Sequence, residues 1–300
     1  MRIPRLKIFV LALVAAVCAT ATVALASPRQ ATDNRAAVQR AFDKTSKVAS
    51  GRFSFTARLA GGGVAGAGFA VSGSGAFNTK HQIAAVTVNL GALSSLLGGA
   101  TGGLAIPSKL DVVAVGNTLY VHIPSLASKA SPGAEWLKFD SKSVKSLPKS
   151  VNPGQVTTDP KQAMKVLTGS ISVHKVGSTT VRGASTTHYV VAVDVTKVVN
   201  GLVPKAADRA STLKSLKAAG VKTVSVDVYV DGSGLVRRVS GNLKNVKVGK
   251  GTPAVTVAVS VDLYDFGQPV KVSAPPASKT ADGSKVLSQL AGALGSGTGG

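Results

Sequence analysis

Four histidines are the residues whose side chains could most readily bind a metal ion or transfer protons. Each lies beside an alternating, strand-like pattern, and they are His81, His122, His174 and His188. A metal site needs several such ligands close together, most often from short spacings in one segment. These histidines are far apart in the sequence, and no cofactor motif accompanies them. We therefore expect no metal site and no cofactor.

Two motifs have the letters of nucleotide-binding or nucleophile signatures but stand in the wrong context. Gly61-x-Gly63-x-x-Gly66 matches a dinucleotide fingerprint, yet it leads into another strand and not into the helix whose N-terminus would hold a pyrophosphate. Ser211-x-x-Lys214 has the spacing of a serine–lysine nucleophile, but it lies inside an amphipathic helical pattern without the partner motifs of that enzyme class. Neither motif supports catalysis.

Paired carboxylates could act as a general acid and a general base, and the chain carries Asp227, Asp231, Asp262 and Asp265 near its last strands. Asp227 and Asp262 fall on the polar positions of alternating segments, which indicates that they face solvent. Asp231 stands beside Gly232, as is typical of a turn. We therefore predict that the protein is not an enzyme.

The segment 221–272 contains the clearest structural pattern in the chain. Valine alternates with polar or aromatic residues over 224–230, and the alternation resumes over 235–239 and 255–263. Strict period two indicates half-buried strands, and the turn at 231–234 suits a hairpin. Such a meander has one apolar and one polar face, and its apolar face must be covered.

The remaining segments add helices and short strands to this meander. Helical periodicity is found over 32–50, 159–169 and 204–219. Alternating patterns predict strands over 52–59, 69–77, 81–90, 112–121 (a hairpin that turns at 116–117), 136–139, 171–176, 179–182 and 188–195. The interleaved order of helices and strands is typical of one α+β domain.

Local signals predict where these elements begin, end or bend. Thr32 or Asp33 is expected to cap the first helix, and Gly51 is expected to end it. Gly73 and Gly75 are expected to bend or bulge the strand that contains them.

The N-terminus has the features of a secretory signal peptide. Basic residues within 2–7 precede an apolar run over 8–17, and Ala24-Leu25-Ala26 forms an A-x-A cleavage site. The apolar run is shorter than a membrane span. Cleavage after Ala26 would place the mature N-terminus at Ser27 and leave no cysteine in the mature chain.

The formal charge of +22 narrows the possible partners. The lysines are scattered over strands and loops, and no aromatic residues interleave with them as a nucleic-acid groove would require. We therefore expect no nucleic-acid partner. An anionic membrane surface or envelope polymer fits an exported basic protein. A solvated basic surface without a specific partner is the alternative.

Three segments of the chain carry a family resemblance. They are TTHYVVAVD at 186–194, VDVYVDGSGLVRRV at 226–239 and VSVDLYDFGQPVKVSAPP at 259–276. Over 36–277 the chain resembles the actinobacterial LppX–LprG group of exported lipoproteins, which is related to the LolA/LolB lipoprotein carriers. The resemblance implies a curved antiparallel half-barrel whose concave face is closed by helices around a hydrophobic cavity. It also implies lipid or glycolipid binding and carriage.

The resemblance bears on the membrane anchor as well. It implies a lipobox with a lipidated Cys18, although Val17 stands where the pattern has a small residue. The protein is accordingly expected in the cell envelope or outside the cell, either soluble after cleavage at Ala26 or anchored at Cys18. The expected organisation is a signal peptide at 1–26, a single domain at 27–277, and a short helix with a Gly/Ser tail at 278–300.

The resulting hypothesis is a monomeric, exported carrier that holds acyl chains of a lipid or glycolipid in a hydrophobic cavity. The cavity wall is predicted to consist of Phe53, Phe55, Leu59, Val113, Leu119, Val121, Val191, Val193, Val226, Val228, Val257, Val259 and Val261. The glycine-broken apolar segment 90–105 is predicted to form a lid through Leu93, Leu96 and Leu97, or else a core-packing loop. The alternative is a non-catalytic structural or adhesion module in which the wall residues fill the core.

Overall fold

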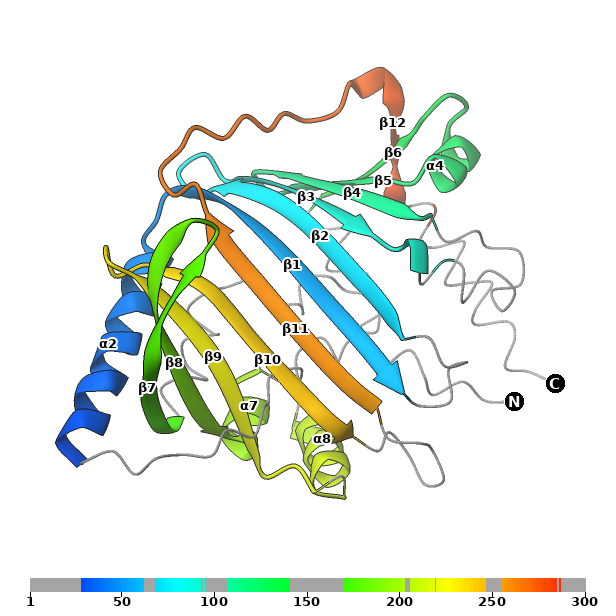
Figure 1. Cartoon of the computed structure of the whole chain (residues 1–300). Coiled ribbons are helices and arrows are strands. Elements are labelled where there is room, and N and C mark those ends of the chain that lie inside the picture. The colour runs from blue at the N-terminus through cyan, green and yellow to red at the C-terminus, as the bar shows by residue number, and fades with distance from the viewer. Residues whose placement is uncertain are drawn as a thin grey trace. The chain divides into compact units, whose positions relative to one another are not determined.

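A computed structural model describes residues 28–61, 68–92, 94, 107–140, 170–202, 206–218, 220–246, 255–284 and 286 (Figure 1). The helices are α2 (Pro28–Ser46), α4 (Pro124–Ala130), α7 (Val195–Leu202), α8 (Ala206–Ala218) and the 3-10 turn η2 (Ala277–Lys279). The strands are β1 (Ser50–Gly61), β2 (Phe69–Asn78), β3 (Ile83–Asn89), β4 (Lys109–Val115), β5 (Thr118–His122), β6 (Trp136–Phe139), β7 (Ser170–Val181), β8 (Ala184–Asp194), β9 (Thr223–Asp231), β10 (Val236–Val246), β11 (Val255–Tyr264) and β12 (Thr280–Asp282).

The strands are hydrogen-bonded in the order β12-β6-β5-β4-β3-β2-β1-β11-β10-β9-β8-β7. The two outermost strands of this order do not pair with each other, so the sheet is open. Where the register is defined, neighbours are antiparallel except for β12, which runs parallel to β6. The predicted α+β class with an open antiparallel sheet is confirmed.

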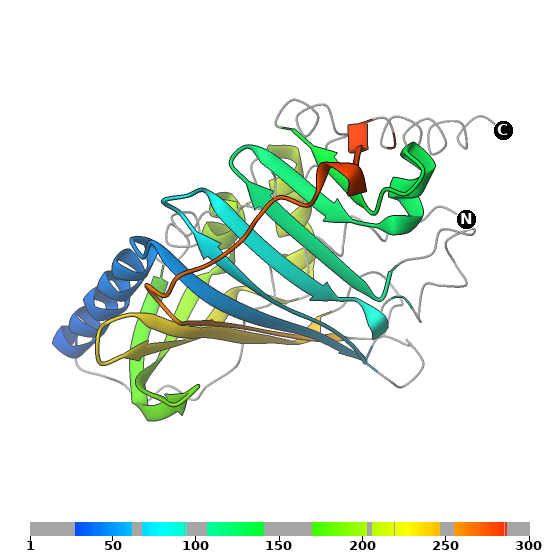
Figure 2. The ribbon, with the colours of Figure 1, turned by 90° about the horizontal axis from the view of Figure 1, so that it is seen from above.

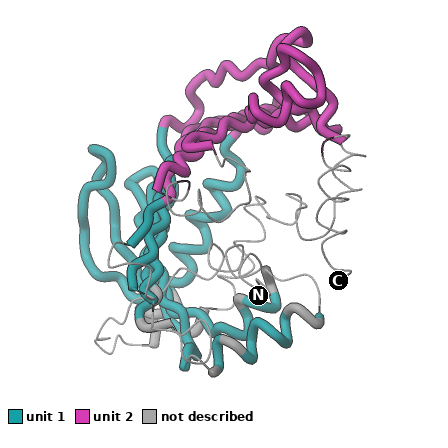
Figure 3. The backbone as a smooth tube through the Cα atoms, turned by 90° about the vertical axis from the view of Figure 1, so that its right-hand side faces the viewer, with its two compact units in different colours: residues 1–48, 53–70, 157–264 teal, residues 49–52, 71–156, 265–300 magenta. Residues whose placement is uncertain are grey.

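The chain divides into two compact units, which are described separately (Figure 3). Unit 1 comprises residues 1–48, 53–70 and 157–264, and unit 2 comprises residues 49–52, 71–156 and 265–300. Unit 1 contains α2, α7, α8 and the strands β7 to β11, and most of β1. Figure 2 shows the ribbon from above, with α2 in blue. Unit 2 contains α4, the strands β3 to β6, most of β2, and β12.

The strand register of unit 1 places its valines on one face of the sheet. Val191 lies opposite Val226, Val228 lies opposite Val239, and Val239 lies opposite Val261. Directly opposite residues in an antiparallel pair share a face. These five valines therefore define the apolar face of unit 1, as the alternation in the sequence predicts.

Three helices bury the β8–β9 part of this face. Val38 and Ala41 of α2, Val195 and Val199 of α7, and the half-buried Leu213 and Leu216 of α8 pack in one cluster with the strand valines. The buried strand members of the cluster are Val173, Val191, Val193, Val224, Val226, Val228, Val230 and Val236. This cluster is the main core of unit 1, and it provides the cover that the alternating pattern requires.

Unit 2 has a smaller core around β6. Ala127 of α4, Leu137 and Phe139 of β6, Ala281 of β12 and the C-terminal Val286 are buried together. The half-buried Leu119 and Val121 pack against them. The parallel pairing of β12 with β6 brings the C-terminal segment onto this core.

The first helix is displaced from its predicted bounds. It begins at Pro28 and ends at Ser46, so neither Thr32 nor Asp33 caps it, and Gly51 lies in β1. The hydroxyl of Thr45 donates to the carbonyl of Ala41 at 2.7 Å, and the hydroxyl of Ser46 donates to that of Asp43 at 2.8 Å. Such side-chain bonds compete with the helical ladder and end the helix before the glycine.

The region between β7 and α8 also differs from the prediction. The strands expected at 171–176 and 179–182 form one strand, β7, whose register shifts between Lys175 and Gly177. A β-bulge with Val176 exposed replaces the expected break, because a bulge accommodates one extra residue without a turn. The next strand begins at Ala184, four residues earlier than predicted.

The sequence pattern predicts a strand that continues to Val195, but in the structure helix α7 begins at this residue. The side chain of Asp194 accepts hydrogen bonds from the backbone N–H of Thr196 at 2.7 Å and of Lys197 at 3.3 Å. Asp is a favoured helix-capping residue, so it starts a helix although the valines that follow favour a strand.

In their pairing with β3, the glycines of β2 cause no bulge. Gly73 pairs with Val88 and Gly75 with Val86 in an unbroken register. The predicted helix at 159–169, the lid residues Leu93, Leu96 and Leu97, the signal peptide and Cys18 lie outside the described residues. Of the expected C-terminal helix, residues 283, 284 and 286 are described and are helical.

Gly283 packs directly under an aromatic ring, which predicts an effect on stability. A Cβ at this position would lie 2.3 Å from the ring of Phe139, which is 8% exposed. Gly283→Ala should therefore lower the free energy of unfolding by about 1–3 kcal/mol through overpacking. The matched control is Gly232→Ala, because a Cβ at Gly232 meets nothing within 4 Å. Urea unfolding of both variants tests this, and equal stability of the two would contradict the packing described for unit 2.

Candidate functional site

The candidate site is the apolar face of unit 1 where it continues onto β11 and β1. Leu59 and Val259 pack against the cluster formed by Val255 and Val257. Strand residues alternate between faces, so Phe53 and Phe55 share the face of Leu59. The predicted wall residues of unit 1 therefore lie on one face: Phe53, Phe55, Leu59, Val191, Val193, Val226, Val228, Val257, Val259 and Val261.

The hydrogen bonds of the opposite face support this placement of the phenylalanines. Arg182 donates both to Ser54 of β1 at 2.8 Å and to Asp262 of β11 at 3.0 Å. Asp262 lies opposite Arg238, and Arg238 lies opposite Tyr229 on the polar face. Ser54 therefore also lies on the polar face, and its neighbour Phe53 faces the other side.

Of the predicted wall residues of unit 2, Val113 does not share a face with Leu119 and Val121. Val113 lies opposite Tyr120, whereas Val121 lies opposite Val112, so Val113 and Val121 point to opposite sides of the sheet. The run Val-Val-Ala-Val at 112–115 is apolar at every position and gives no alternation from which to choose a face. Val112, which the sequence interpretation missed, shares a face with Leu119 and Val121.

Burial divides the apolar face of unit 1 into two parts. Val191, Val193, Val226 and Val228 are at most 7% exposed beneath the helices, and Val228 is fully buried. On β1 and along Val259 and Val261 of β11 the corresponding side chains remain half-buried, whereas Val255 at the start of β11 is 7% exposed. We call these residues the half-buried wall: Phe53, Phe55, Leu59, Val259 and Val261. Val257, which is 8% exposed, lies at the boundary between the two parts.

The half-buried wall is apolar along both of its strands. The positions that face this side are Phe53, Phe55, Ala57 and Leu59 on β1, and Val255, Val257, Val259, Val261 and Leu263 on β11. None of them can donate or accept a hydrogen bond through its side chain. The wall can therefore bind hydrocarbon by contact, but it offers no group for catalysis and no directional polar anchor.

An ion network holds the opposite face of the same strands together. Asp262 accepts from Arg238 at 2.6 and 2.9 Å, while Arg182 also lies over the ring of Tyr264 at 4.1 Å. The hydrogen bond from Arg238 lowers the pKa of Asp262, and the reciprocal bond raises the pKa of Arg238. Both groups therefore stay ionised at neutral pH, which suits a structural ion pair and not proton transfer.

The two histidines with described ion-pair contacts are structural neighbours of other side chains. His188 lies 2.7 Å from Asp227 and stacks on Tyr229 at 4.5 Å between ring centroids. His122 lies 3.9 Å from Glu135. Among the described residues, no three side chains of the metal-ligating types gather into a group that could hold an ion.

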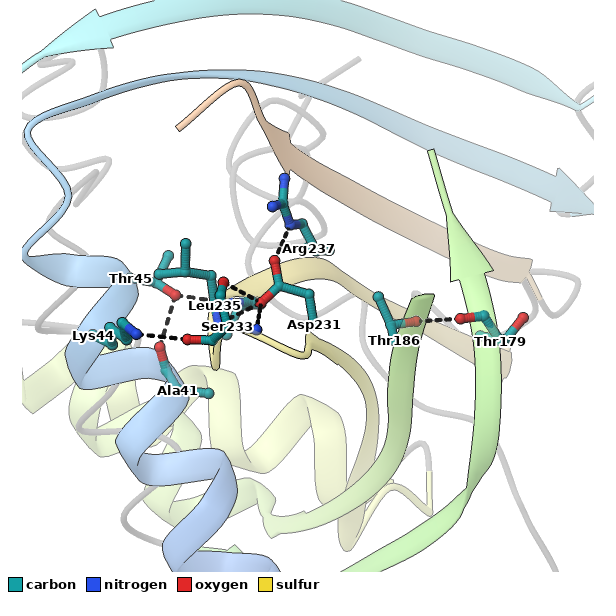
Figure 4. A network of polar contacts seen from close by, with 10 residues as sticks. Ala41, Lys44, Thr45, Thr179, Thr186, Asp231, Ser233, Leu235 and Arg237 are labelled. Carbon is teal, nitrogen blue, oxygen red and sulfur yellow. Dashed lines mark hydrogen bonds and ion pairs between the residues drawn. The ribbon is translucent and has the colours of Figure 1, made fainter. Parts of the chain in front are cut away.

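A second polar network fastens α2 to the β9–β10 hairpin at one end of the apolar face (Figure 4). Lys44 donates to the carbonyl of Ser233 at 2.6 Å, and the backbone N–H of Val236 donates to the hydroxyl of Thr45 at 2.9 Å. Asp231 orders the hairpin turn by accepting the backbone N–H and the hydroxyl of Ser233. These bonds keep α2 over the valines that it covers.

In the described part of the chain, no helix has the length and hydropathy needed to cross a bilayer.

Comparison with known proteins finds similarity at the level of structure. No family model and no curated protein matches the chain. Solved structures similar to it include lipoprotein LppX from Mycobacterium tuberculosis, at 13% identity over 81% of this chain and 99% of that chain, with a TM-score of 0.45. LprF from Mycobacterium bovis is similar at 11% identity over 82% of this chain and 98% of that chain, with a TM-score of 0.46.

A LolA superfamily protein from Nitrosomonas europaea is similar at 11% identity over 81% of this chain and 94% of that chain, with a TM-score of 0.26. The fold of this chain is defined by its own strand order and register.

The ion network predicts a pH-dependent contribution to stability. Asp262→Asn removes the charge that two arginines share, and charge-assisted hydrogen bonds contribute about 1.5–3 kcal/mol. We expect a loss of about 2 kcal/mol at pH 7. Folding lowers the pKa of Asp262. Its carboxylate therefore makes its full contribution to the free energy of unfolding at any pH above the pKa of the unfolded state, about 3.9. It is lost as the pH falls through the lower folded value.

Urea unfolding at neutral and acidic pH measures this difference. The control is Asp265→Asn, because the Arg52–Asp265 pair is exposed on both sides and such pairs contribute little. A difference between wild type and Asp262→Asn that persisted at the lowest pH would show that the lost stability does not come from the carboxylate charge.

Proposed function

We propose that the protein is an exported, non-enzymatic carrier that holds the acyl chains of a lipid or glycolipid against the half-buried wall. The observation that supports this most directly is the uneven burial of one continuous apolar face. Helices α2, α7 and α8 close its β8–β9 part, while the side chains on β1 and those of Val259 and Val261 on β11 remain half-buried. An apolar surface left partly open within a folded unit is a natural place for an apolar ligand.

The chemistry of the wall suits hydrocarbon and little else. Each methylene removed from water contributes about 0.8 kcal/mol, so one long acyl chain supplies substantial affinity by contact alone. Valine and phenylalanine side chains on a strand give a smooth surface that imposes no hydrogen-bond geometry. The wall should therefore accept chains of different lengths, and the head group would be recognised elsewhere.

The second candidate is a structural or adhesion module of the envelope with a filled core. The tight packing of Val191, Val193, Val226 and Val228 favours this reading for the β8–β9 part of the face. We accordingly restrict the proposed ligand contacts of unit 1 to the half-buried wall. The predicted wall residues of β8 and β9 are assigned to the protein core.

The proposal includes export, and the position of α2 supports cleavage after Ala26. The helix begins at Pro28, so cleavage there would leave the folded domain intact. We expect mass analysis of the secreted protein to find Ser27 at its N-terminus. A mature chain that begins with a diacylated Cys18 would contradict this and make the protein membrane-anchored.

Tryptophan substitution on either part of the apolar face tests the proposed division. Val259→Trp should fill space that an acyl chain uses, and should reduce uptake of a fluorescent fatty-acyl probe about tenfold or more with little change in melting temperature. Val228→Trp should instead overpack a fully buried site and lower stability by about 1–3 kcal/mol. Probe titration and thermal unfolding of both variants provide the two measurements.

The opposite pattern would favour the structural module. If Val259→Trp lowered the melting temperature as much as Val228→Trp, and the wild-type protein took up no probe, the wall would be packed core. Lost uptake in Val228→Trp alone would place the ligand beneath the helices and would also contradict the proposed division.

A further inference from the structure

Helix α8 exposes lysines to solvent beside the leucines that it packs into the core. Leu213 and Leu216 pack against the core of unit 1, whereas Lys214 and Lys217 are exposed. Residues three apart lie on the same side of a helix, so the two lysines form a pair. Lys222, just after the helix, is exposed as well. We call Lys214, Lys217 and Lys222 the basic turn, and it lies where α8 leads into β9 (Figure 1).

The basic turn carries uncompensated charge within the described part of the chain. None of its three lysines forms an ion pair with a described carboxylate. The nearby Asp194 instead accepts bonds from the backbone of Thr196 and Lys197 at the start of α7. Its charge is thus directed at the N-terminus of a helix, where the helix dipole favours it.

Backbone hydrogen bonds hold the basic turn in a defined conformation. The N–H of Val221 donates to the carbonyl of Leu216 at 2.9 Å, and the N–H of Gly220 donates to that of Lys217 at 3.0 Å. This pair of bonds is a Schellman motif, which requires the left-handed φ of 75° that Gly220 adopts. The carbonyl of Lys222 accepts the N–H of Val195 at 3.1 Å, which joins the turn to α7.

The basic turn borders the proposed ligand-binding wall. Val221, between its lysines, packs both against the buried core cluster and against the cluster of Val255 and Val257. Leu59 of the half-buried wall belongs to that second cluster. A surface that contacts the lysines would therefore lie next to the end of the wall where β1 ends and β11 begins.

We propose that the basic turn docks the protein onto an anionic lipid surface and places the half-buried wall beside the lipid that it loads or delivers. Anionic head groups attract exposed lysines, and the attraction is screened by salt. The apolar side of α8 is occupied by the core, so docking is electrostatic, shallow and reversible. A single-stranded nucleic acid would need aromatic side chains beside the lysines, and the described residues of α8 and the turn include none.

The loading step rests on the proposed carrier function, whereas the docking itself does not. Docking is measured by sedimentation of the full protein with phosphatidylcholine vesicles that contain or lack phosphatidylglycerol. The variant K214Q/K217Q/K222Q should lose about a hundredfold in affinity for the anionic vesicles, since each lysine near such a surface contributes a factor of about five. Added salt should likewise lower the affinity of the wild-type protein for the anionic vesicles.

The matched control K80Q/K129Q/K138Q removes the same charge from exposed lysines of unit 2. It should retain most of the wild-type affinity. Equal losses in the two variants would show that net charge alone drives binding and would overturn the proposal. Equal affinity of the wild type for neutral and anionic vesicles would also overturn it. So would a loss of affinity for soluble polyglutamate, on substitution of these lysines, that is larger than the loss of affinity for vesicles.

Uptake of the acyl probe without vesicles separates this proposal from the carrier function. K214Q/K217Q/K222Q should take up the soluble probe as the wild type does, because its wall is intact, and should fail only to extract labelled lipid from anionic vesicles. If the variant lost soluble uptake as well, the lysines would belong to the ligand site and the docking assignment would be wrong. If the wild type docked on vesicles but took up no probe, the carrier function would fail and docking would stand.

Discussion

The need to cover one continuous apolar sheet face is the constraint on which the rest of unit 1 depends. Cross-strand register aligns the valines of β8, β9, β10 and β11 on a single side, and water must be kept from them. Helices α2, α7 and α8 satisfy this requirement over β8 and β9. Over β1 and over Val259 and Val261 of β11 the side chains stay half-buried, and the proposed function follows from that difference.

The polar contacts make this arrangement specific without adding chemistry of their own. Asp262 joins the β7–β8 turn to β10 and β11 through Arg182 and Arg238. Lys44 and Thr45 join α2 to the β9–β10 hairpin. The Asp262 network consists of charge-assisted hydrogen bonds, and in the α2 network the bond of Lys44 is charge-assisted whereas Thr45 bonds neutral backbone groups. Both networks favour rigidity over catalysis. The strands that carry the wall are therefore positioned from their polar side as well as from the helices.

Much of this structure follows from the sequence, and the exceptions have physical causes. Strict alternation predicts β9 and β11 and places Val226, Val228 and Val259 on one face, because a period of two admits only one assignment. In β10 the predicted alternation over 235–239 is broken by a register shift between Val236 and Arg238, which brings Val236 and Val239 to the same face. The face of Val113 could not be predicted, because the residues of its strand that face either side of the sheet are apolar. Helix α7 was missed because its valines favour a strand, although Asp194 carries the capping signal. The burial of each predicted wall residue depends on helices far away in the sequence. No local sequence pattern could therefore predict which part of the apolar face is buried and which part is half-buried.

The central claim, that the half-buried wall binds acyl chains, is tested most directly by native mass spectrometry of the protein purified from its secreting host without detergent. The account predicts a population heavier than the apoprotein by the mass of a lipid, which solvent extraction releases and which Val259→Trp lacks. A folded wild-type protein that carries only its apoprotein mass, before and after incubation with acyl lipids, would contradict it.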